Sequence, residues 1–336
     1  MRFVIVGAGG IGGALGARLM ETGREVLLLA RGAHAAARKS AGLRLAIPER
    51  VILVRPPVAE TVAELDLRMG DVLILTAKSQ DGAALLPDLA AAPVAAHAGA
   101  QPRGLGAAGE NLPIYCAQNG AANEAAALRF FADVHGIEVT LQATHLEPGR
   151  VTATSTPYTG VFELGRYPAG SDGTDALVAE HLSASGILAT VRDDVMAWKR
   201  AKLARNLRNA LEAMCGPDPA DKASAAALAA GMIAEARACF AAAGLTVIPD
   251  EQFAANVGVI TARPVEGQSR AGGSTWQSVA RGLGSVETDY LNGEIALLGR
   301  LHGVPTPLNV RVQQRMARFI RAGEPIGSVD PASLLG

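Results

Sequence analysis

The fold is decided by residues 2–31, which read RFVIVGAGGIGGALGARLMETGREVLLLAR. Residues 2–6 are mostly apolar and rich in β-branched side chains, which predicts a buried strand. Residues 7–12 fit the pattern G-x-G-x-x-G, residues 14–21 predict a helix, and residues 25–29 predict a second strand. Strand, glycine turn, helix and strand in this order are typical of the βαβ unit that binds a dinucleotide.

Each glycine of the pattern has its own expected task. Gly7 permits a tight turn, Gly9 lets the backbone approach a pyrophosphate, and Gly12 lets helix and strand pack closely. The N-terminus of the following helix presents free N–H groups and the positive end of its dipole to the phosphates. Together with Gly10 and Ile11, these glycines are the contacts that we expect for the cofactor.

The end of the second strand indicates which dinucleotide is bound. Sites for NAD usually place Asp or Glu there, where it accepts hydrogen bonds from the ribose hydroxyls. Here the strand is followed by Ala30-Arg31-Gly32, and a guanidinium binds a 2′-phosphate that a carboxylate would repel. The sequence therefore favours NADP(H) over NAD(H). The alternative is that Arg31 is a solvated surface charge.

Length and composition exclude several classes of protein. The chain has 336 residues, of which 19% are charged and 49% hydrophobic, as in a soluble protein with two domains. Its net charge is -1 and it has no basic tract, so we expect no nucleic acid partner. Residues 82–100 are apolar but contain Pro87, Asp88, Pro93 and His97, so we expect no membrane span.

The cysteines and histidines indicate neither a disulfide framework nor a metal site. Cys116, Cys215 and Cys239 lie far apart, and the six histidines form no pair at ligand spacing. We therefore expect free thiols in a reducing compartment and no metal ion. The first strand begins where a signal peptide would lie, which predicts a cytoplasmic location.

The chain divides into a mixed part and a helical part. The predicted fold class is α/β, with an N-terminal Rossmann-like doubly wound domain at 1–192 and an all-helical C-terminal domain at 193–336. The apolar faces of the second domain form either its own core or the interface of a homodimer. Further strands are expected at 71–76, 112–116, 139–144, 150–154, 159–164 and 188–191, a loop at 93–111, and helices at 33–41, from 82, and at 121–131, 174–184, 195–215, 224–243 (capped by Ser224), 250–257, near 276, 285–302 and 308–321.

The densest polar group outside the glycine turn lies in the predicted helix 195–215. At about 100° per residue, Lys202, Asn206 and Asn209 fall within about 60° of one another, so one ammonium and two amides share a face. A lysine can protonate a ketone oxygen, and amides can bind a carboxylate or hydroxyl without adding charge. The alternative is a solvated basic face, which the neighbouring Lys and Arg residues favour.

A second polar cluster opens the predicted helix 285–302. On a helix, Glu287 and Asp289 point about 200° apart, so that one faces a cleft and the other solvent. Taken alone, this cluster is more typical of an acidic first turn that complements the helix dipole.

Six motifs follow one another along nearly the whole chain. They are Gly7-x-Gly9-x-x-Gly12 with Arg31, Thr76-Ala77-Lys78, Gln118-Asn119-Gly120, Lys202-Leu203-x-x-Asn206 with Asn209-Ala210-Leu211, Ser274-Thr275-Trp276-Gln277, and Glu287-x-Asp289-Tyr290-Leu291-Asn292-Gly293. In this order they resemble the ketopantoate reductase (2-dehydropantoate 2-reductase) family. The resemblance implies a Rossmann domain followed by a helical domain, and NADPH-dependent reduction of a small keto acid, 2-dehydropantoate, to (R)-pantoate.

The resemblance also implies roles for single residues. Lys202 resembles the general acid that protonates the C2 carbonyl oxygen, and Glu287 the carboxylate that binds the substrate hydroxyl. The remaining implied contacts are Asn206, Asn209 and Ser274 for the substrate, and Lys78 and Asn119 near the ribose and nicotinamide of the cofactor.

Some positions depart from the family pattern. Asn209 lies one position nearer to Lys202 than the pattern places it, and Trp198 lies farther from that lysine. Lys199 therefore remains an alternative general acid. A different keto acid, a hydroxy acid or an imine remains an alternative substrate, and a non-catalytic NADP(H) sensor is the alternative outside enzymes.

Overall fold

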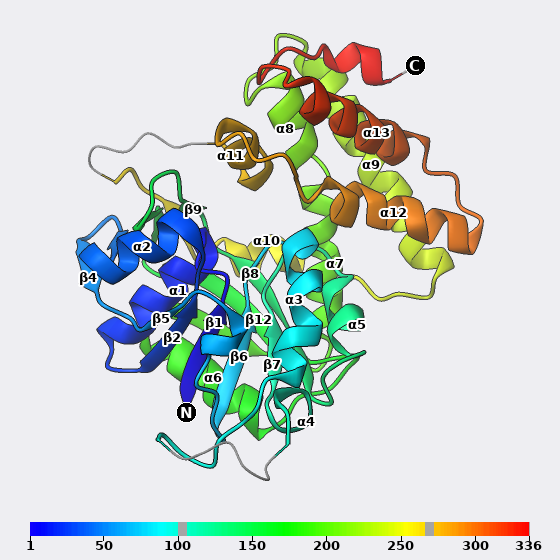
Figure 1. Ribbon diagram of the computed structural model, residues 1–336. Helices are drawn as coiled ribbons and strands as arrows, with labels where there is room; N and C mark the ends of the chain where they lie inside the picture. Colours follow the sequence, from blue (N-terminus) through cyan, green and yellow to red (C-terminus); the bar gives the residue numbers. More distant parts are fainter. Residues whose placement is uncertain (100–105, 266–271, 336) are drawn as a thin grey trace. The chain divides into compact units, whose positions relative to one another are not determined.

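The computed structural model describes residues 1–99, 106–265 and 272–335 (Figure 1). The chain separates into two compact units. Unit 1 contains residues 1–118, residues 123–196 and the described part of 251–269. Unit 2 contains residues 119–122, residues 197–250 and the described part of 270–336. The chain therefore passes between the units several times.

Unit 1 is built on an eight-stranded sheet with the order β13-β12-β8-β7-β6-β1-β2-β5. From β8 to β5 every neighbouring pair is parallel, whereas β12 is antiparallel to β8. Apolar side chains alternate between two cores, with Phe3 and Ile5 in one and Val4 and Val6 in the other. The strands are β1 (Arg2–Val6), β2 (Glu25–Leu29), β5 (Val58–Ala59), β6 (Asp71–Leu75), β7 (Ile114–Cys116), β8 (Val134–Thr140), β12 (Gly160–Arg166) and β13 (Ile187–Val191).

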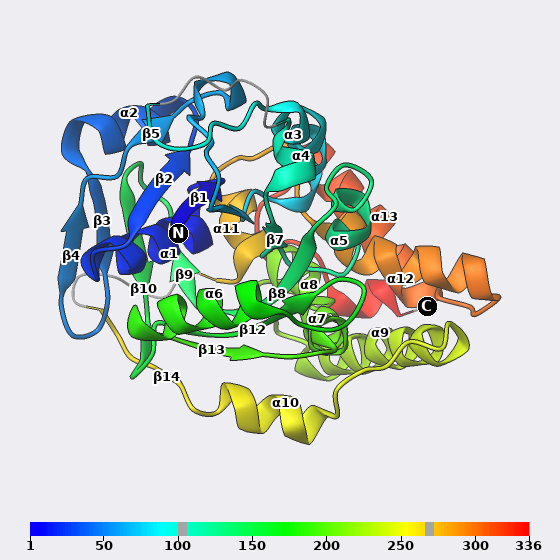
Figure 2. The same cartoon turned by 90° about the horizontal axis from the view of Figure 1, so that it is seen from below.

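Helices cover both faces of this sheet (Figures 1 and 2). The helices α1 (Gly10–Glu21) and α6 (Gly173–Ala184) pack on one face, and α3 (Ser79–Ala91), α4 (Ala108–Asn111) and α5 (Asn123–Ala127) pack on the other. Such a doubly wound arrangement places the ligand-binding turns at the carboxyl ends of the parallel strands.

A second sheet with the order β4-β3-β10-β9 packs against α1. Its strands are β3 (Leu43–Ala46), β4 (Val51–Val54), β9 (Ala143–Thr144) and β10 (Arg150–Ala153). The helix α2 (Gly32–Ala41) leads from β2 toward this sheet. The glycine turn that precedes α1 is therefore flanked by two sheets of unit 1.

Residues from the helical half of the sequence also belong to unit 1. The strand β14 (Thr261–Ala262) pairs with β11 (Ser155–Thr156). In α10 (Asp250–Val257), Asn256 Nδ2 donates a hydrogen bond of 2.7 Å to the buried carboxylate of Glu163.

The described part of unit 2 is helical. Its core joins apolar side chains from all its long helices, among them Leu203, Phe240, Ile295 and Phe319. The helices are α7 (Val195–Asn206, in unit 2 from Ala197), α8 (Asn209–Cys215), α9 (Lys222–Ala242), α11 (Ser274–Ala280), α12 (Thr288–His302) and α13 (Pro307–Ala322), followed by the 3-10 turn Pro331–Leu334.

One described helix, α9, is long and apolar enough to cross a membrane, judged by length and composition alone. It is a different segment from the apolar stretch at 82–100 that the sequence singled out. Its buried side chains, among them Leu228, Met232 and Phe240, belong to the core of unit 2, and 28% of its apolar window is buried.

The predicted fold class, a Rossmann-like α/β domain followed by a helical domain, is confirmed. Several element boundaries were wrong. The predicted helix 121–131 shortens to Asn123–Ala127, and the predicted strand 150–154 pairs in the small sheet instead of beside the large one. The helix predicted from Ser224 starts at Lys222, because the carboxylate of Asp221 caps it. The loop predicted at 93–111 contains the short helix α4, and its residues 100–105 lie outside the described residues.

Candidate active site

Close packing explains two of the three pattern glycines of the turn between β1 and α1. Gly7 has a φ of +101°, and a Cβ there would lie 2.4 Å from the backbone nitrogen of Ala77. A Cβ on Gly12 would lie 2.2 Å from the carbonyl oxygen of Gly7 and 2.4 Å from Thr76 Oγ1. The turn therefore packs directly on the loop after β6, and no larger residue fits at either position.

Gly9 differs from these two glycines because its surroundings are open. A Cβ there would meet no heavy atom within 4 Å, and its φ is −77°. Neither crowding nor a positive φ among the described residues requires glycine here. The backbone at Gly9 is therefore open on the side where a Cβ would lie, and in a dinucleotide site a pyrophosphate approaches the backbone at this position.

The N-terminus of α1 is suited to an anion. Within the described residues, no side chain caps it and its first turn holds no acidic residue. The backbone N–H groups at Gly10 and Ile11 belong to this first turn, where helices leave their N–H groups without intrahelical partners. The cradle that a dinucleotide phosphate requires is therefore present.

Two predicted cofactor residues follow strands next to β1. Val6 pairs with Leu29 of β2 and with Leu75 of β6, so the three strands end together. Arg31 lies two positions after Leu29, is exposed and precedes α2; Lys78 lies three positions after Leu75, is half-buried and precedes α3. Both cations therefore follow strands that end at the same edge of the sheet as the glycine turn.

Asn119, the last predicted cofactor residue, follows β7 but makes its contacts with unit 2. The next residue, Gly120, has a φ of +86°, and a Cβ there would lie 2.9 Å from the carbonyl oxygen of Tyr290 in α12. This glycine is required because the turn packs directly on α12 backbone.

A group of basic side chains that no sequence motif predicted lies beside the glycine turn. Arg38 of α2 is 1% exposed and donates hydrogen bonds from Nη2 to the carbonyl oxygen of Ala8 and from Nη1 to that of His34, the latter at 3.3 Å. His34 Nδ1 lies 3.0 Å from Nε2 of the buried His145. The sequence contains only a weak indication of this group, because His34 and Arg38 are four positions apart and so share a face of one helix.

In unit 2, Lys202 and Asn206 lie four positions apart in the last turns of α7, and both are half-buried. The predicted shared face is confirmed for this pair. Lys199, the alternative general acid, is only 3% exposed. Lys202 is therefore the more exposed of the two lysines.

The predicted shared face was wrong for Asn209. The helix expected over 195–215 ends at Asn206, and Asn209 starts a separate helix, α8. The Nδ2 of Asn292 in α12 donates a hydrogen bond of 3.2 Å to the carbonyl oxygen of Leu207, within the break. A side chain from a distant helix therefore holds the turn between the two asparagines.

The break brings Asn209 to a different partner. A Cβ built on Gly273 would lie 3.9 Å from Asn209 Oδ1, and the N–H of Gly273 donates to Glu212 Oε1 of α8 at 3.1 Å. Ser274 follows Gly273 and begins α11. The structure thus brings together Asn209 and Ser274, which were predicted as substrate contacts from distant parts of the sequence.

Glu287 lies just before α12, so the predicted start of this helix at 285 was wrong. Glu287 is buried, with 5% of its surface exposed. Asp289 is exposed and accepts a hydrogen bond of 2.7 Å from Gln313 Nε2. One acid of this cluster therefore faces the interior and the other faces the surface.

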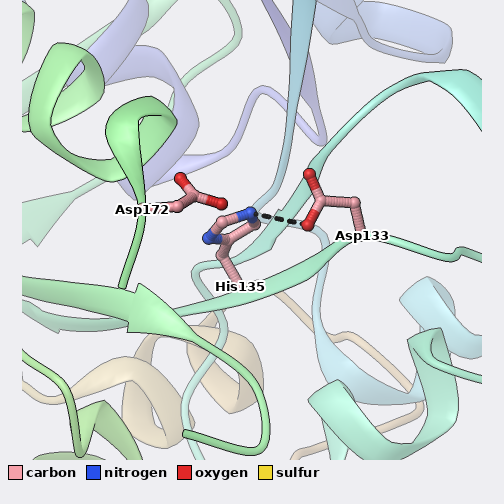
Figure 3. A group of neighbouring side chains, drawn as sticks. All are labelled: Asp133, His135 and Asp172. Carbon is pink, nitrogen blue, oxygen red and sulfur yellow. Dashed lines mark ion pairs between the residues drawn. The ribbon is translucent and has the colours of Figure 1, made fainter. Parts of the chain in front are cut away.

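A further group of titratable side chains lies in unit 1, where Asp133, His135 and Asp172 place possible ligand atoms within 4.8 Å of one another (Figure 3). His135 is buried, with Nε2 3.2 Å from Asp133 and Nδ1 2.8 Å from Asp175. Burial disfavours the imidazolium, but the hydrogen bonds and charges of the two carboxylates outweigh this and raise the pKa of His135 to about 9.

The guanidinium of Arg166 already occupies the cation position in this group. Its Nη2 lies 2.9 Å from Asp133 and its Nη1 lies 3.3 Å from Asp172. A protonated histidine has no lone pair to offer a metal. The group is therefore a partly buried ion-pair network, centred on the buried His135, that joins β8 to the N-terminus of α6.

Together, the fold and these residues define a dinucleotide-dependent oxidoreductase. Comparison with known proteins supports this class: the family model described as ketopantoate reductase PanE/ApbA matches residues 3–168, and its C-terminal counterpart matches residues 194–318. The chain belongs to this family, and it is an oxidoreductase that acts on a CH–OH group.

Individual proteins are similar to this chain in sequence or in fold. A 2-dehydropantoate 2-reductase from Mesorhizobium japonicum is 28% identical over 344 aligned residues, which cover 91% of this chain and 94% of the relative. The crystal structure of a PanE/ApbA family ketopantoate reductase from Ralstonia eutropha has a TM-score of 0.71 and 24% identity, covering 96% of this chain and 100% of that one. A D-mandelate dehydrogenase with NADH and anilino(oxo)acetate has a TM-score of 0.74 and 21% identity, covering 99% of both chains.

Proposed function

We propose that this protein uses NADPH to reduce 2-dehydropantoate to (R)-pantoate in the cytoplasm. The observation that carries the proposal is the match of both family models, together with a 2-dehydropantoate 2-reductase that is similar over nearly its full length. The three cysteines are buried and form no disulfide, in keeping with a reducing compartment.

The residues of unit 1 fit the proposed cofactor. The open space at Gly9 and the uncapped N-terminus of α1 suit a pyrophosphate, and Arg31 supplies a cation where a 2′-phosphate lies in such folds. Lys78 and Asn119 are the proposed neighbours of the ribose and nicotinamide. When bound, NADPH supplies the hydride that C2 of the keto acid accepts.

The residues of unit 2 supply the proton and bind the substrate. We assign Lys202 Nζ as the donor of the proton that the C2 carbonyl oxygen takes up as C2 accepts the hydride. The carboxylate of Glu287 accepts a hydrogen bond from the substrate hydroxyl. Asn206, Asn209 and Ser274 bind the polar groups of the substrate, so that loss of any one weakens orientation more than the proton transfer itself.

Removal of the ammonium group tests this assignment. Lys202→Ala should lower kcat by a factor of about 100 to 10,000 and leave the dissociation constant for NADPH unchanged, because general acid catalysis contributes on that order. Lys199→Ala is the matched variant one turn earlier. Near-normal turnover in Lys202→Ala, with loss in Lys199→Ala, would transfer the proton donor to Lys199.

Replacement of Arg31 tests the choice of cofactor. Arg31→Ala should raise KM for NADPH by about tenfold or more, since a charge-assisted contact to phosphate is lost, and should leave KM for NADH unchanged. Equal kcat/KM for the two cofactors in the unaltered protein would contradict the choice of NADPH.

A second substrate class has a specific observation in its favour. The D-mandelate dehydrogenase structure has this fold over 99% of both chains and holds anilino(oxo)acetate, an oxoacetate with an aromatic group. Reduction of a bulkier 2-keto acid is therefore the alternative. Steady-state NADPH oxidation with 2-dehydropantoate, beside benzoylformate and several aliphatic 2-keto acids, separates the two, because the correct substrate shows the highest kcat/KM.

A further inference from the structure

Arg38 is a buried cation whose side-chain hydrogen bonds go to its own helix and to the glycine turn. It sits near the end of α2 at 1% exposure, and its hydrogen bonds go to the backbone oxygens of Ala8 and His34. A buried arginine normally pairs with a carboxylate, because an unpaired buried charge is costly. Within the described residues, Arg38 forms no such ion pair, and burial alone lowers its pKa to about 10.

The contact with Ala8 determines how the glycine turn presents its backbone. The peptide bond between Ala8 and Gly9 is trans, so its carbonyl and its N–H point in opposite directions. Because the carbonyl of Ala8 is held by Arg38, the N–H of Gly9 points away from the buried guanidinium. Gly9 is also the residue whose Cβ position is open.

Arg38 also lies against the start of α1. A Cβ on Gly13, in the first turns of α1, would lie 3.5 Å from Arg38 Nη2. One guanidinium thus lies against both the turn and the start of the helix whose N–H groups face a phosphate. Its positive charge adds to that of the helix dipole.

We propose that Arg38 is a positioning residue for the dinucleotide, which fixes the Ala8 carbonyl and thereby the orientation of the Gly9 N–H toward the pyrophosphate. This inference rests on the proposed dinucleotide-dependent function. It assigns Arg38 no contact with the nicotinamide or the 2′-phosphate. Its effect is therefore common to every ligand that contains an adenosine pyrophosphate, in contrast to the effect of Arg31.

The test measures dissociation constants of the full-length protein for NADPH, NADH and ADP-ribose. We expect Arg38→Met to raise all three by one common factor of about 10 to 100, with kcat at saturating NADPH within about twofold of the unaltered protein. Arg18→Met is the matched control, because Arg18 is a second buried arginine of unit 1 that instead pairs with Glu21 at 2.7 Å. This control should leave all three constants unchanged.

The outcomes separate clearly. Unchanged dissociation constants in a folded Arg38→Met variant would overturn the proposal, and a loss confined to NADPH would place the guanidinium at the 2′-phosphate instead. If Arg38→Met does not fold, Arg38→Leu carries the test, because leucine also removes the charge and every donor. Unaltered affinity in that variant also overturns the proposal. Failure of the unaltered protein to bind NADPH and NADH would refute the proposed function itself.

Discussion

Gly9→Ala and Gly12→Ala should impair two different properties, although both glycines belong to one turn. Gly9→Ala should lower the affinity for NADPH, and Gly12→Ala should lower the stability of the fold. A Cβ on Gly12 would lie 2.2 Å from the carbonyl oxygen of Gly7, 2.4 Å from Thr76 Oγ1 and 2.9 Å from Ile5 Cγ2. The nearest of these atoms is backbone, so the turn itself has to move. A Cβ on Gly9 meets no heavy atom within 4 Å.

The magnitudes follow from these distances. Overpacking of a buried site costs about 1–3 kcal/mol, and we expect Gly12→Ala at the upper end, because backbone yields less readily than a side chain. Gly9 occupies the N-cap position of α1, where alanine is less favourable than glycine by about 1 kcal/mol at most. The added methyl group, however, occupies space that the proposed pyrophosphate needs. We expect NADPH affinity to fall about 100-fold, or about 2.8 kcal/mol.

Urea unfolding and titration of NADPH fluorescence measure the two effects separately. Gly173→Ala is the control, since a Cβ there also meets nothing within 4 Å and the residue lies at the start of α6. Gly9→Ala should resemble this control in stability and differ from it in affinity. Normal NADPH affinity in Gly9→Ala, or normal stability in Gly12→Ala, would refute the reasoning from these distances.

Two further substitutions test buried polar contacts. The folded pKa of His135 is about 9, above the usual value of 6.5, so its contribution to stability is complete below pH 6.5 and is lost as the pH rises through 9. The difference in unfolding free energy between the unaltered protein and His135→Gln should therefore shrink by about 3 kcal/mol from pH 6 to pH 10, while exposed His302→Gln shows no such trend. Asn292→Leu removes the hydrogen-bond donor to the Leu207 carbonyl and should cost about 2–3 kcal/mol of stability. It should also lower kcat/KM and leave the dissociation constant for NADPH unchanged. Stopped-flow kinetics and equilibrium titration measure these two effects.

Local sequence patterns were sufficient to predict the strands around the glycine turn in the large sheet. The strand at 2–6, the glycine turn and the strand at 25–29 follow one another within one motif. In β6, residues 72–75 form a continuous apolar run that can be recognised without its partner strands. The small sheet could not be found in this way. Its strand β3 pairs with β10, and Arg44 lies opposite Arg150, so the pairing joins residues about a hundred positions apart.

The position of Asn209 shows why the candidate site was only partly predictable. No glycine or proline interrupts residues 195–215, so local propensity predicts one continuous helix. The hydrogen bond from Asn292 to Leu207 joins the break to a residue 85 positions away, which no local pattern can indicate. Because the helix breaks between Asn206 and Asn209, the position of Asn209 relative to Lys202 does not follow from 100° per residue. The placement of Asn209 depends instead on its neighbours at the start of α11.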